Sequence, residues 1–341
     1  MIERGPIYSS VLRDVLRTFS DDFTVPLGTT RSVGDWLVHG AFQVQSYSSK
    51  KIDIEASKSD FNSYAFGEIE LLRNHCLEQF YEMACAFQDA RPRSDAWQLV
   101  TTYYFGFFAA HQFLRLIGRP VLYLDKNRLS FLNKLAVIGV GSKSVTAGSF
   151  LLFESAQISA TQSLYSLVRM ERIHEDTWKE VFAYLKTKLS ILSKGESSSE
   201  SLLYSLISTK SVESVMGRMD WPSVVRTRAN YRAGVAYRLI DKIAPARMKR
   251  NLERWSAQSN SKCVGFLAGS CISCLSGGEL EIERAGKLML DVCMSIFVFS
   301  NVIYKDLLER RRFDRRWESR RKSFVEENQH VMQSFGKLFT G

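Results

Sequence analysis

Arg169 and His174 are residues of types that can act on a phosphodiester, and four residues separate them. A histidine can move protons to and from a ribose 2′-hydroxyl and the leaving oxygen, while an arginine stabilises the charge that builds on the phosphate. Chance alone produces such a spacing about once in a chain this rich in arginine, so the spacing by itself assigns no role. The alternative interpretation is a surface turn, in which His174 ends one helix and the next helix begins.

A second candidate site lies in the segment RTRANYR, residues 226–232. If a helix begins near Ser223, its arginines lie close to one face and can clamp phosphates while a tyrosine stacks on a base. The expected nucleic-acid-binding residues of this segment are Arg226, Arg228, Asn230, Tyr231 and Arg232. The alternative, in which these arginines pair with acidic residues of neighbouring helices, is the commoner arrangement.

The segment from residue 305 to 322 concentrates positive charge, with nine basic and four acidic residues. In a helix, Phe313, Trp317 and Phe324 would form one apolar stripe. An arginine ridge would run beside this stripe and consist of Arg312, Arg316 and Arg320. Such a ridge suits the phosphate backbone of RNA or an acidic protein surface, and a helix lying on a membrane surface is a further alternative.

The composition indicates a globular protein with an anionic partner. The chain has 341 residues and a net charge of +10, which favours nucleic acid, a membrane surface or an acidic protein. We find no secretory signal and no apolar run of about 18 residues, so we expect a cytoplasmic protein without a transmembrane segment. Six irregularly spaced cysteines argue against a disulfide framework, and the C-x-x-C pair Cys271 and Cys274 is expected to be buried rather than to bind zinc. We expect neither a metal nor a cofactor.

Helical periodicity dominates the chain, and strand signal is scarce. Residues 150–193 are expected to form two helices with a break near His174. Residues 38–54 alternate weakly and could hold one short strand. Further helices are expected over residues 61–90, 96–118, 127–138, 202–216, 279–312 and 313–337. The predicted fold class is therefore mostly α, a multi-helix bundle.

The helix over residues 96–118 resembles a core helix of HEPN-like domains, a helical family of prokaryotic RNases and substrate-binding modules. The likeness rests on Trp97, on the pairs Tyr103-Tyr104, Phe107-Phe108 and Ala109-Ala110, and on Leu114 and Gly118. Arg228-Ala229-Asn230-Tyr231 is similar to an Arg-x-x-(Asp/Asn)-Tyr motif near the end of some members. Together they cover roughly residues 60–240.

The resemblance implies a metal-independent ribonuclease that acts as a dimer and uses an arginine followed four to six residues later by a histidine. The chain departs from this pattern, because no histidine follows Arg226, Arg228 or Arg232 at these spacings. Arg169 and His174 match the spacing, so the resemblance implies that they are the candidate catalytic pair, but Met170 stands where a polar residue is expected. The missing histidines put catalysis in doubt and leave RNA binding as the broader expectation.

The expected organisation is a mixed segment over residues 1–60, a helical and HEPN-like core over 61–240, and a basic helical region over 241–341. The function predicted for it is nucleic-acid binding, with RNA favoured, as a ribonuclease or as a component of a bacterial toxin–antitoxin or phage-defence system. The alternative is a non-catalytic helical scaffold that docks an acidic protein, as a homodimer or within a larger complex. Motifs of P-loop, Rossmann, zinc-protease and serine-hydrolase enzymes are absent from the sequence.

Overall fold

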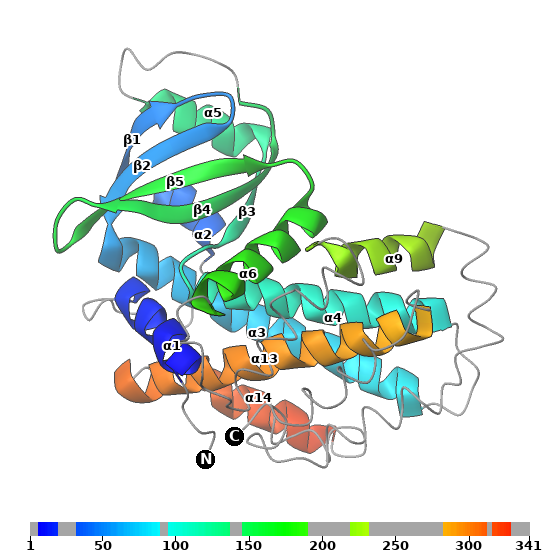
Figure 1. Ribbon diagram of the computed structural model, residues 1–341. Helices are drawn as coiled ribbons and strands as arrows, with labels where there is room; N and C mark the ends of the chain where they lie inside the picture. Colours follow the sequence, from blue (N-terminus) through cyan, green and yellow to red (C-terminus); the bar gives the residue numbers. More distant parts are fainter. Residues whose placement is uncertain are drawn as a thin grey trace.

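The computed structural model describes residues 6–19, 32–88, 95–136, 145–189, 219–231, 282–311 and 316–328. Within these ranges the helices are α1 (Pro6–Thr18), α2 (Val33–His39), α3 (Lys58–Gln88), α4 (Asp95–Leu116), α5 (Lys126–Leu135), α6 (Ile173–Leu189), α9 (Trp221–Tyr231), α13 (Ile282–Arg311) and α14 (Arg316–Glu327). The strands are β1 (Phe42–Tyr47), β2 (Lys51–Ser57), β3 (Val121–Leu124), β4 (Gly148–Gln157) and β5 (Gln162–Met170). Figure 1 shows the sheet above one end of a layer of long helices.

A five-stranded antiparallel sheet corrects the prediction of an all-helical bundle. The strand order is β1-β2-β5-β4-β3, and every neighbouring pair is antiparallel. β1 and β2 occupy the region where one short strand was expected. The sheet joins a strand from the first sixty residues to a later one, because β2 pairs with β5 from Lys51 opposite Val168 to Ser57 opposite Gln162.

The β4–β5 hairpin was wrongly predicted as a helix, and its composition explains why. β4 contains no β-branched residue, and Val168 is the one such residue in β5. The connecting residues 158–161 include no Gly, Pro or Asn, so the usual signal of a hairpin turn is missing. Pairing on both sides of β5 overrides the local preference, and Tyr165 and Leu167 are buried on one face of the sheet. The second half of the predicted region, α6, is helical as expected.

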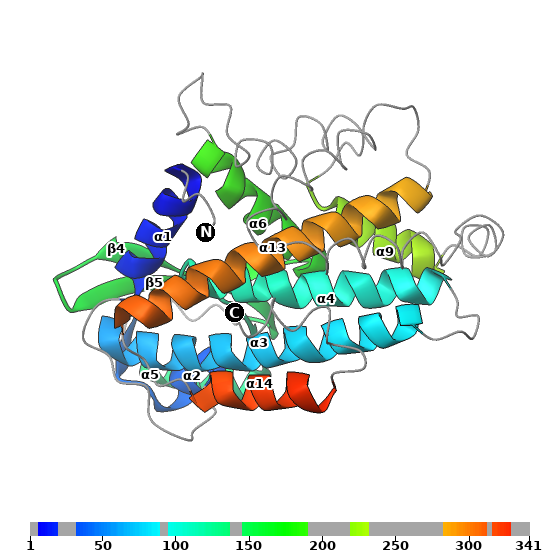
Figure 2. The same ribbon diagram turned by 90° about the horizontal axis from the view of Figure 1, so that it is seen from below.

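The long helices α3, α4 and α13 lie side by side beneath the sheet (Figure 2). α4 packs against α3, α13, α6 and α9, which confirms that it is buried on more than one side. Gly106 lets α4 approach α13 closely, because a Cβ at this position would stand 1.9 Å from the Cys293 sulfur. The residues 96–118 thus owe their nearly uniform apolar character to four neighbouring helices.

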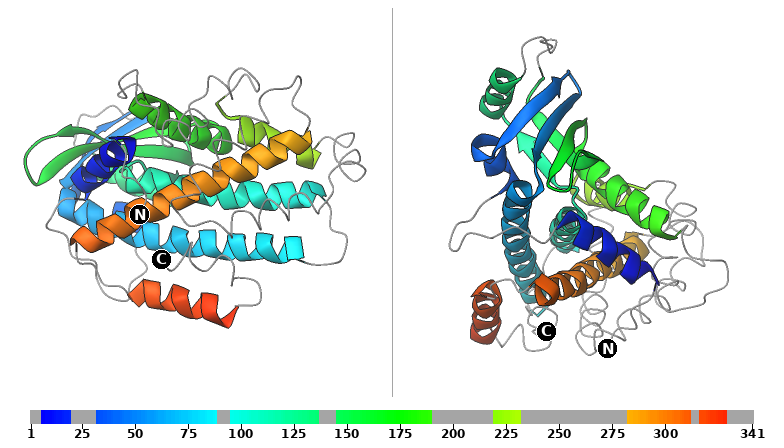
Figure 3. Two further views of the ribbon diagram at one scale, coloured as in Figure 1. Left: turned by 60° about the horizontal axis from the view of Figure 1, so that its bottom comes forward. Right: turned by 90° about the vertical axis from the view of Figure 1, so that its left-hand side faces the viewer.

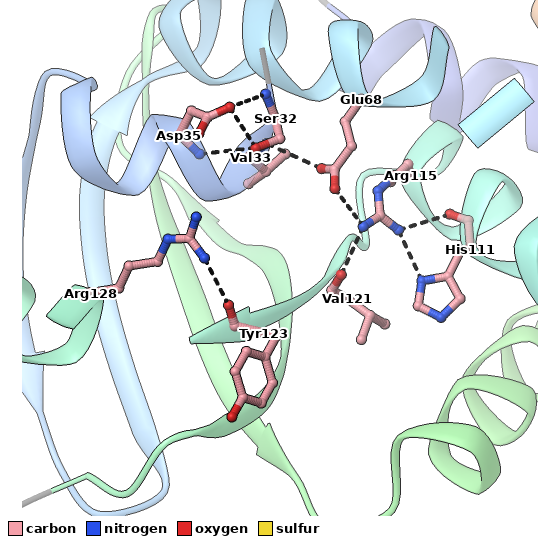
Figure 4. Close-up of polar contacts among 9 residues, drawn as sticks. All are labelled: Ser32, Val33, Asp35, Glu68, His111, Arg115, Val121, Tyr123 and Arg128. Carbon is pink, nitrogen blue, oxygen red and sulfur yellow. Dashed lines mark hydrogen bonds and ion pairs between the residues drawn. The ribbon is translucent and has the colours of Figure 1, made fainter. Parts of the chain in front are cut away.

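An arginine at the end of α4 ties the sheet to the helical layer (Figure 4). Arg115 is buried, and its Nη2 donates to Glu68 of α3 at 2.8 Å and to the carbonyl of Val121 in β3 at 2.8 Å. Glu68 also accepts the backbone N–H of Val33, the first residue of α2. Ser32 caps α2, and Asp35 completes a capping box with it.

Residues 288–310 of α13 are long and apolar enough to cross a membrane, by length and composition alone. Of its most apolar 18-residue stretch, 78% is buried inside the protein. Core helices of soluble proteins pass the same test. The packing of α13 on α4 and α1 buries this apolar stretch within the protein.

Candidate nucleic-acid site

His174 stands in the first turn of α6 and meets a pair of tyrosines on α4. Its Nδ1 lies 3.0 Å from the hydroxyl of Tyr103. The imidazole ring also packs on Phe107, with 4.6 Å between ring centroids, and on Tyr104, with 6.2 Å. These contacts fix the ring against α4, so His174 is a positioned side chain and not part of a free surface turn.

Arg226 of α9 reaches the same pair of tyrosines from another direction. Its guanidinium carbon lies 5.5 Å from the ring centroid of Tyr103 and 5.7 Å from that of Tyr104. Its Nη2 donates to the Tyr104 hydroxyl at 3.3 Å. A guanidinium has five N–H donors, and this is the one bond that Arg226 makes to a side chain within the described ranges. The two tyrosines thus hold an arginine and a histidine from distant segments together.

The electrostatics of the cluster keep His174 neutral at pH 7. Burial, followed by the positive charge of Arg226, lowers the pKa of His174 to about 4. Burial also raises the pKa of Tyr103, so its phenol keeps its proton. When Nδ1 of His174 donates to the Tyr103 oxygen, Nε2 retains a lone pair and is a base.

One face of α4 presents a part-exposed strip of aromatic rings beside this cluster. Trp97 is 65% exposed, and Tyr104 and Phe108 are half-buried. Their spacing of seven and four residues places them on one helical face, about 10 Å and about 6 Å apart along the axis. The exposed ring of His75 stacks on Phe108, with 5.5 Å between centroids. Such rings are suited to stacking on unpaired bases.

The structure does not bring Arg169 to His174. Arg169 lies on β5 opposite Phe150, and its Nη1 donates to the hydroxyl and carbonyl of Thr146. In the part of the chain that the structure describes, Arg169 and His174 share no contact. The reason is local: β5 ends at Met170 and α6 begins at Ile173, so the spacing spans a strand and a helix instead of one element.

The other residues expected in α9 differ in what the structure says of them. Asn230 is exposed, one turn after Arg226. Arg228 and Tyr231 belong to α9, but their side chains fall outside the described part, as does Arg232 altogether. The prediction that α9 carries a contact surface therefore rests on Arg226 and Asn230.

The predicted arginine ridge of the C-terminal helix is described at one position, Arg320, which is exposed. Arg312 and the side chain of Arg316 lie outside the described residues. Arg321, the residue after Arg320 in α14, is buried and forms an ion pair with Glu70 of α3 at 2.8 Å. Figure 2 shows α14 alongside α3. Arg321 thus holds α14 against α3, and its charge is paired with Glu70 inside the protein.

His111 lies next to the cluster but has a structural role. It is buried, its ring meets Phe107 at 4.4 Å, and its Nδ1 lies 3.2 Å from Nη1 of Arg115 (Figure 4). Burial, then the charges of Arg115 and His174, lower the pKa of His111 well below its usual range. A buried histidine beside a paired arginine is not positioned to contact a substrate.

Among the residues with described positions, no group of three or more His, Cys, Asp or Glu side chains could hold a metal ion. The C-x-x-C pair, Cys271 and Cys274, lies outside that part. Comparisons with protein-family models, with curated proteins and with solved structures found no match. The resemblance to HEPN-like domains therefore stays a prediction, and the site must be interpreted from its own geometry.

Sequence reasoning selected His174 and Arg226 but did not pair them, and it treated the aromatic residues of α4 as core. The spacing of Trp97, Tyr104 and Phe108 could have been recognised as one helical face. Nothing in one sequence indicates that Arg226 lies beside His174, because 51 intervening residues separate them.

Proposed function

We propose that the protein binds single-stranded RNA along α4 and cleaves it at His174 and Arg226. The observation that carries the proposal is the meeting of these two side chains on Tyr103 and Tyr104, beside a part-exposed aromatic strip. The net charge of +10 supports an anionic partner. A role in toxin–antitoxin or phage-defence systems rests on the HEPN-like resemblance alone.

Binding would use stacking and one phosphate contact. Unpaired bases stack on Trp97, Tyr104 and Phe108, each stack contributing about 1–3 kcal/mol. The guanidinium of Arg226 makes one hydrogen bond to a described side chain, so further N–H donors remain for a ligand, and the tyrosine pair already holds it in place. A held guanidinium loses little conformational freedom when it binds a phosphate, which favours a bidentate contact.

His174 and Arg226 can together perform the cleavage of a phosphodiester without another protein group. Nε2 of neutral His174 takes the proton of a ribose 2′-hydroxyl, and the 2′-oxygen forms a new bond to phosphorus. The bond from phosphorus to the 5′-oxygen breaks, and the imidazolium returns the proton to that oxygen. Arg226 stabilises the charge that develops on the phosphate oxygens. The products are a 2′,3′-cyclic phosphate and a 5′-hydroxyl.

Substrate binding would also tune the base. A pKa of about 4 makes His174 a weak base in the free protein. A phosphate bound at Arg226 offsets the positive charge that depresses this pKa. The pKa of His174 is then higher when RNA is in place, which makes His174 a stronger base in the complex than in the free protein.

The test measures retention and cleavage of labelled single-stranded RNA at low salt in the presence of EDTA. H174A should retain RNA but lose at least about 100-fold in cleavage rate, since general acid–base catalysis contributes that much or more. R226M should weaken retention and cleavage together. R169A should cleave like the wild type, since Arg169 contacts Thr146 and not His174.

R172M is the matched control for R226M, because Arg172 is an exposed arginine just before α6 that pairs with Glu175 at 2.9 Å. It should leave RNA retention unchanged. Equal cleavage by H174A and the wild type would reject the catalytic assignment. Absence of retention at low salt would reject RNA binding and leave the scaffold for an acidic protein.

A further inference from the structure

A cleft of about 530 Å³ lies between α1, the last turns of α6, the turn after α4 and the β4–β5 hairpin. Small-molecule sites occupy about 300–1,000 Å³. α6 lines the cleft with one face, which comprises Glu180, Ala183, Tyr184, Thr187 and Lys188. None of the residues proposed to bind or cleave RNA lines it. Figure 3 shows α1 and α6 next to the sheet on this side of the protein.

The charged groups of the cleft leave one positive charge uncompensated. Arg17 of α1 is exposed at the cleft and makes no ion pair with a described residue. The other three cations are each matched by a carboxylate. The pairs are Lys188 with Asp14 at 2.5 Å, Arg119 with Glu180 at 2.8 Å, and Lys58 with Glu154 at 3.3 Å. An anionic group on a ligand would therefore bind at Arg17.

Aromatic rings line the same cleft. Phe153 on β4 and Tyr184 on α6 are half-buried. The guanidinium carbon of Arg119 lies 5.7 Å from the Phe153 ring centroid, and Nζ of Lys188 lies 5.2 Å from that of Tyr184. Tyr165 and Phe61 pack together beneath them, with 4.5 Å between centroids. Glu154 supplies carboxylate oxygens that can accept N–H groups of a ligand. A flat heterocycle with N–H donors suits these surroundings.

We propose that this cleft binds a nucleoside monophosphate. The base would lie against Phe153 and Tyr184, and the phosphate would bind Arg17 at the opening. The cleft has the size for one such molecule and an excess of one positive charge for its phosphate. This site is separate from the RNA site, although α6 contributes side chains to both.

The test is calorimetric titration of the full-length protein with AMP, adenosine and inorganic phosphate. Wild-type protein should bind AMP with a Kd below about 1 mM, and adenosine and phosphate at least about tenfold more weakly. R17E should weaken AMP binding at least about tenfold by reversing the charge. R13E is its matched control, because Arg13 is exposed on α1 one turn earlier and does not line the cleft.

A second variant, A183W, fills the cleft from an exposed position on α6, so it should fold normally and fail to bind AMP. It should still retain RNA, which separates a failure of this proposal from a failure of the RNA proposal. The assignment is overturned if wild-type protein does not bind AMP at 1 mM, if phosphate alone binds as tightly as AMP, or if R17E and A183W bind AMP like the wild type.

Discussion

Replacing Arg226 by methionine should raise the pKa of His174. The substitution removes the positive charge but keeps a long apolar side chain against Tyr103 and Tyr104. A nearby cation disfavours the imidazolium, so its loss favours protonation and shifts the pKa upward. The sign of the change therefore tests whether the two side chains face one another.

Its magnitude follows from the order of the two causes. The pKa of His174 lies at about 4 instead of the usual 6.5, and burial lowers it more than Arg226 does. Burial persists in R226M, so less than half of the depression should be relieved. We expect a pKa of about 5 in R226M, which is still below the ordinary value.

The assay is NMR titration of the ring resonances of His174, assigned by their loss in H174Q. R172M serves as the matched control, because this exposed arginine is close in sequence but pairs with Glu175. It should leave the pKa unchanged. A pKa near 6.5 in the wild type, or no change in R226M, would refute the placement of Arg226 beside a half-buried His174.

Three further predictions concern stability. R321M should lower the free energy of unfolding in urea by about 3–5 kcal/mol, because it leaves Glu70 buried without its partner. The double variant R321M/E70M should lose much less stability, because it removes both charges. If the losses of the two single variants add in the double variant, this account is wrong. G106A should lower the free energy of unfolding by about 1–3 kcal/mol, because the added methyl group overpacks against Cys293. Adding C293A should recover part of that loss. An unchanged melting temperature in G106A would contradict the close approach of α4 and α13. Because the pKa of His174 is lower in the folded than in the unfolded state, neutral His174 should contribute to stability fully above about pH 6.5, and this contribution should fall toward pH 4. In thermal melts, the melting temperature of H174Q should depend less on pH than that of the wild type. Equal pH dependence in the two proteins would contradict the lowered pKa.

The long helices were predictable because their own residues specify them. The expected segments 61–90 and 96–118 correspond to α3 and α4, and 279–312 corresponds to α13. Each has apolar residues at helical intervals over more than twenty positions, so periodicity outweighs local exceptions. The helix at residues 202–216 lies outside the described part and stays a prediction.

The sheet was harder to predict because its strands are specified by their neighbours. β4 contains Leu, Glu and Ala, which favour helices, and no β-branched residue, and it becomes a strand by pairing with β3 and β5. The candidate site met the same difficulty. The spacing of Arg169 and His174 in the sequence suggested that they form a pair. In the structure, Arg226 instead contacts the tyrosines beside His174, and this contact depends on how α9 packs on α4.

The missed sheet nevertheless positions the chemistry. β5 is hydrogen-bonded on both sides, to β2 and to β4, so its end at Met170 is fixed. α6 begins three residues later, at Ile173, which leaves the chain little freedom to place His174 elsewhere. If residues 150–170 were helical, the start of α6 would depend on a flexible helix–helix connection. The strand therefore brings His174 to Tyr103. The register of the sheet controls the geometry of the proposed site, although no strand contributes a side chain to that site.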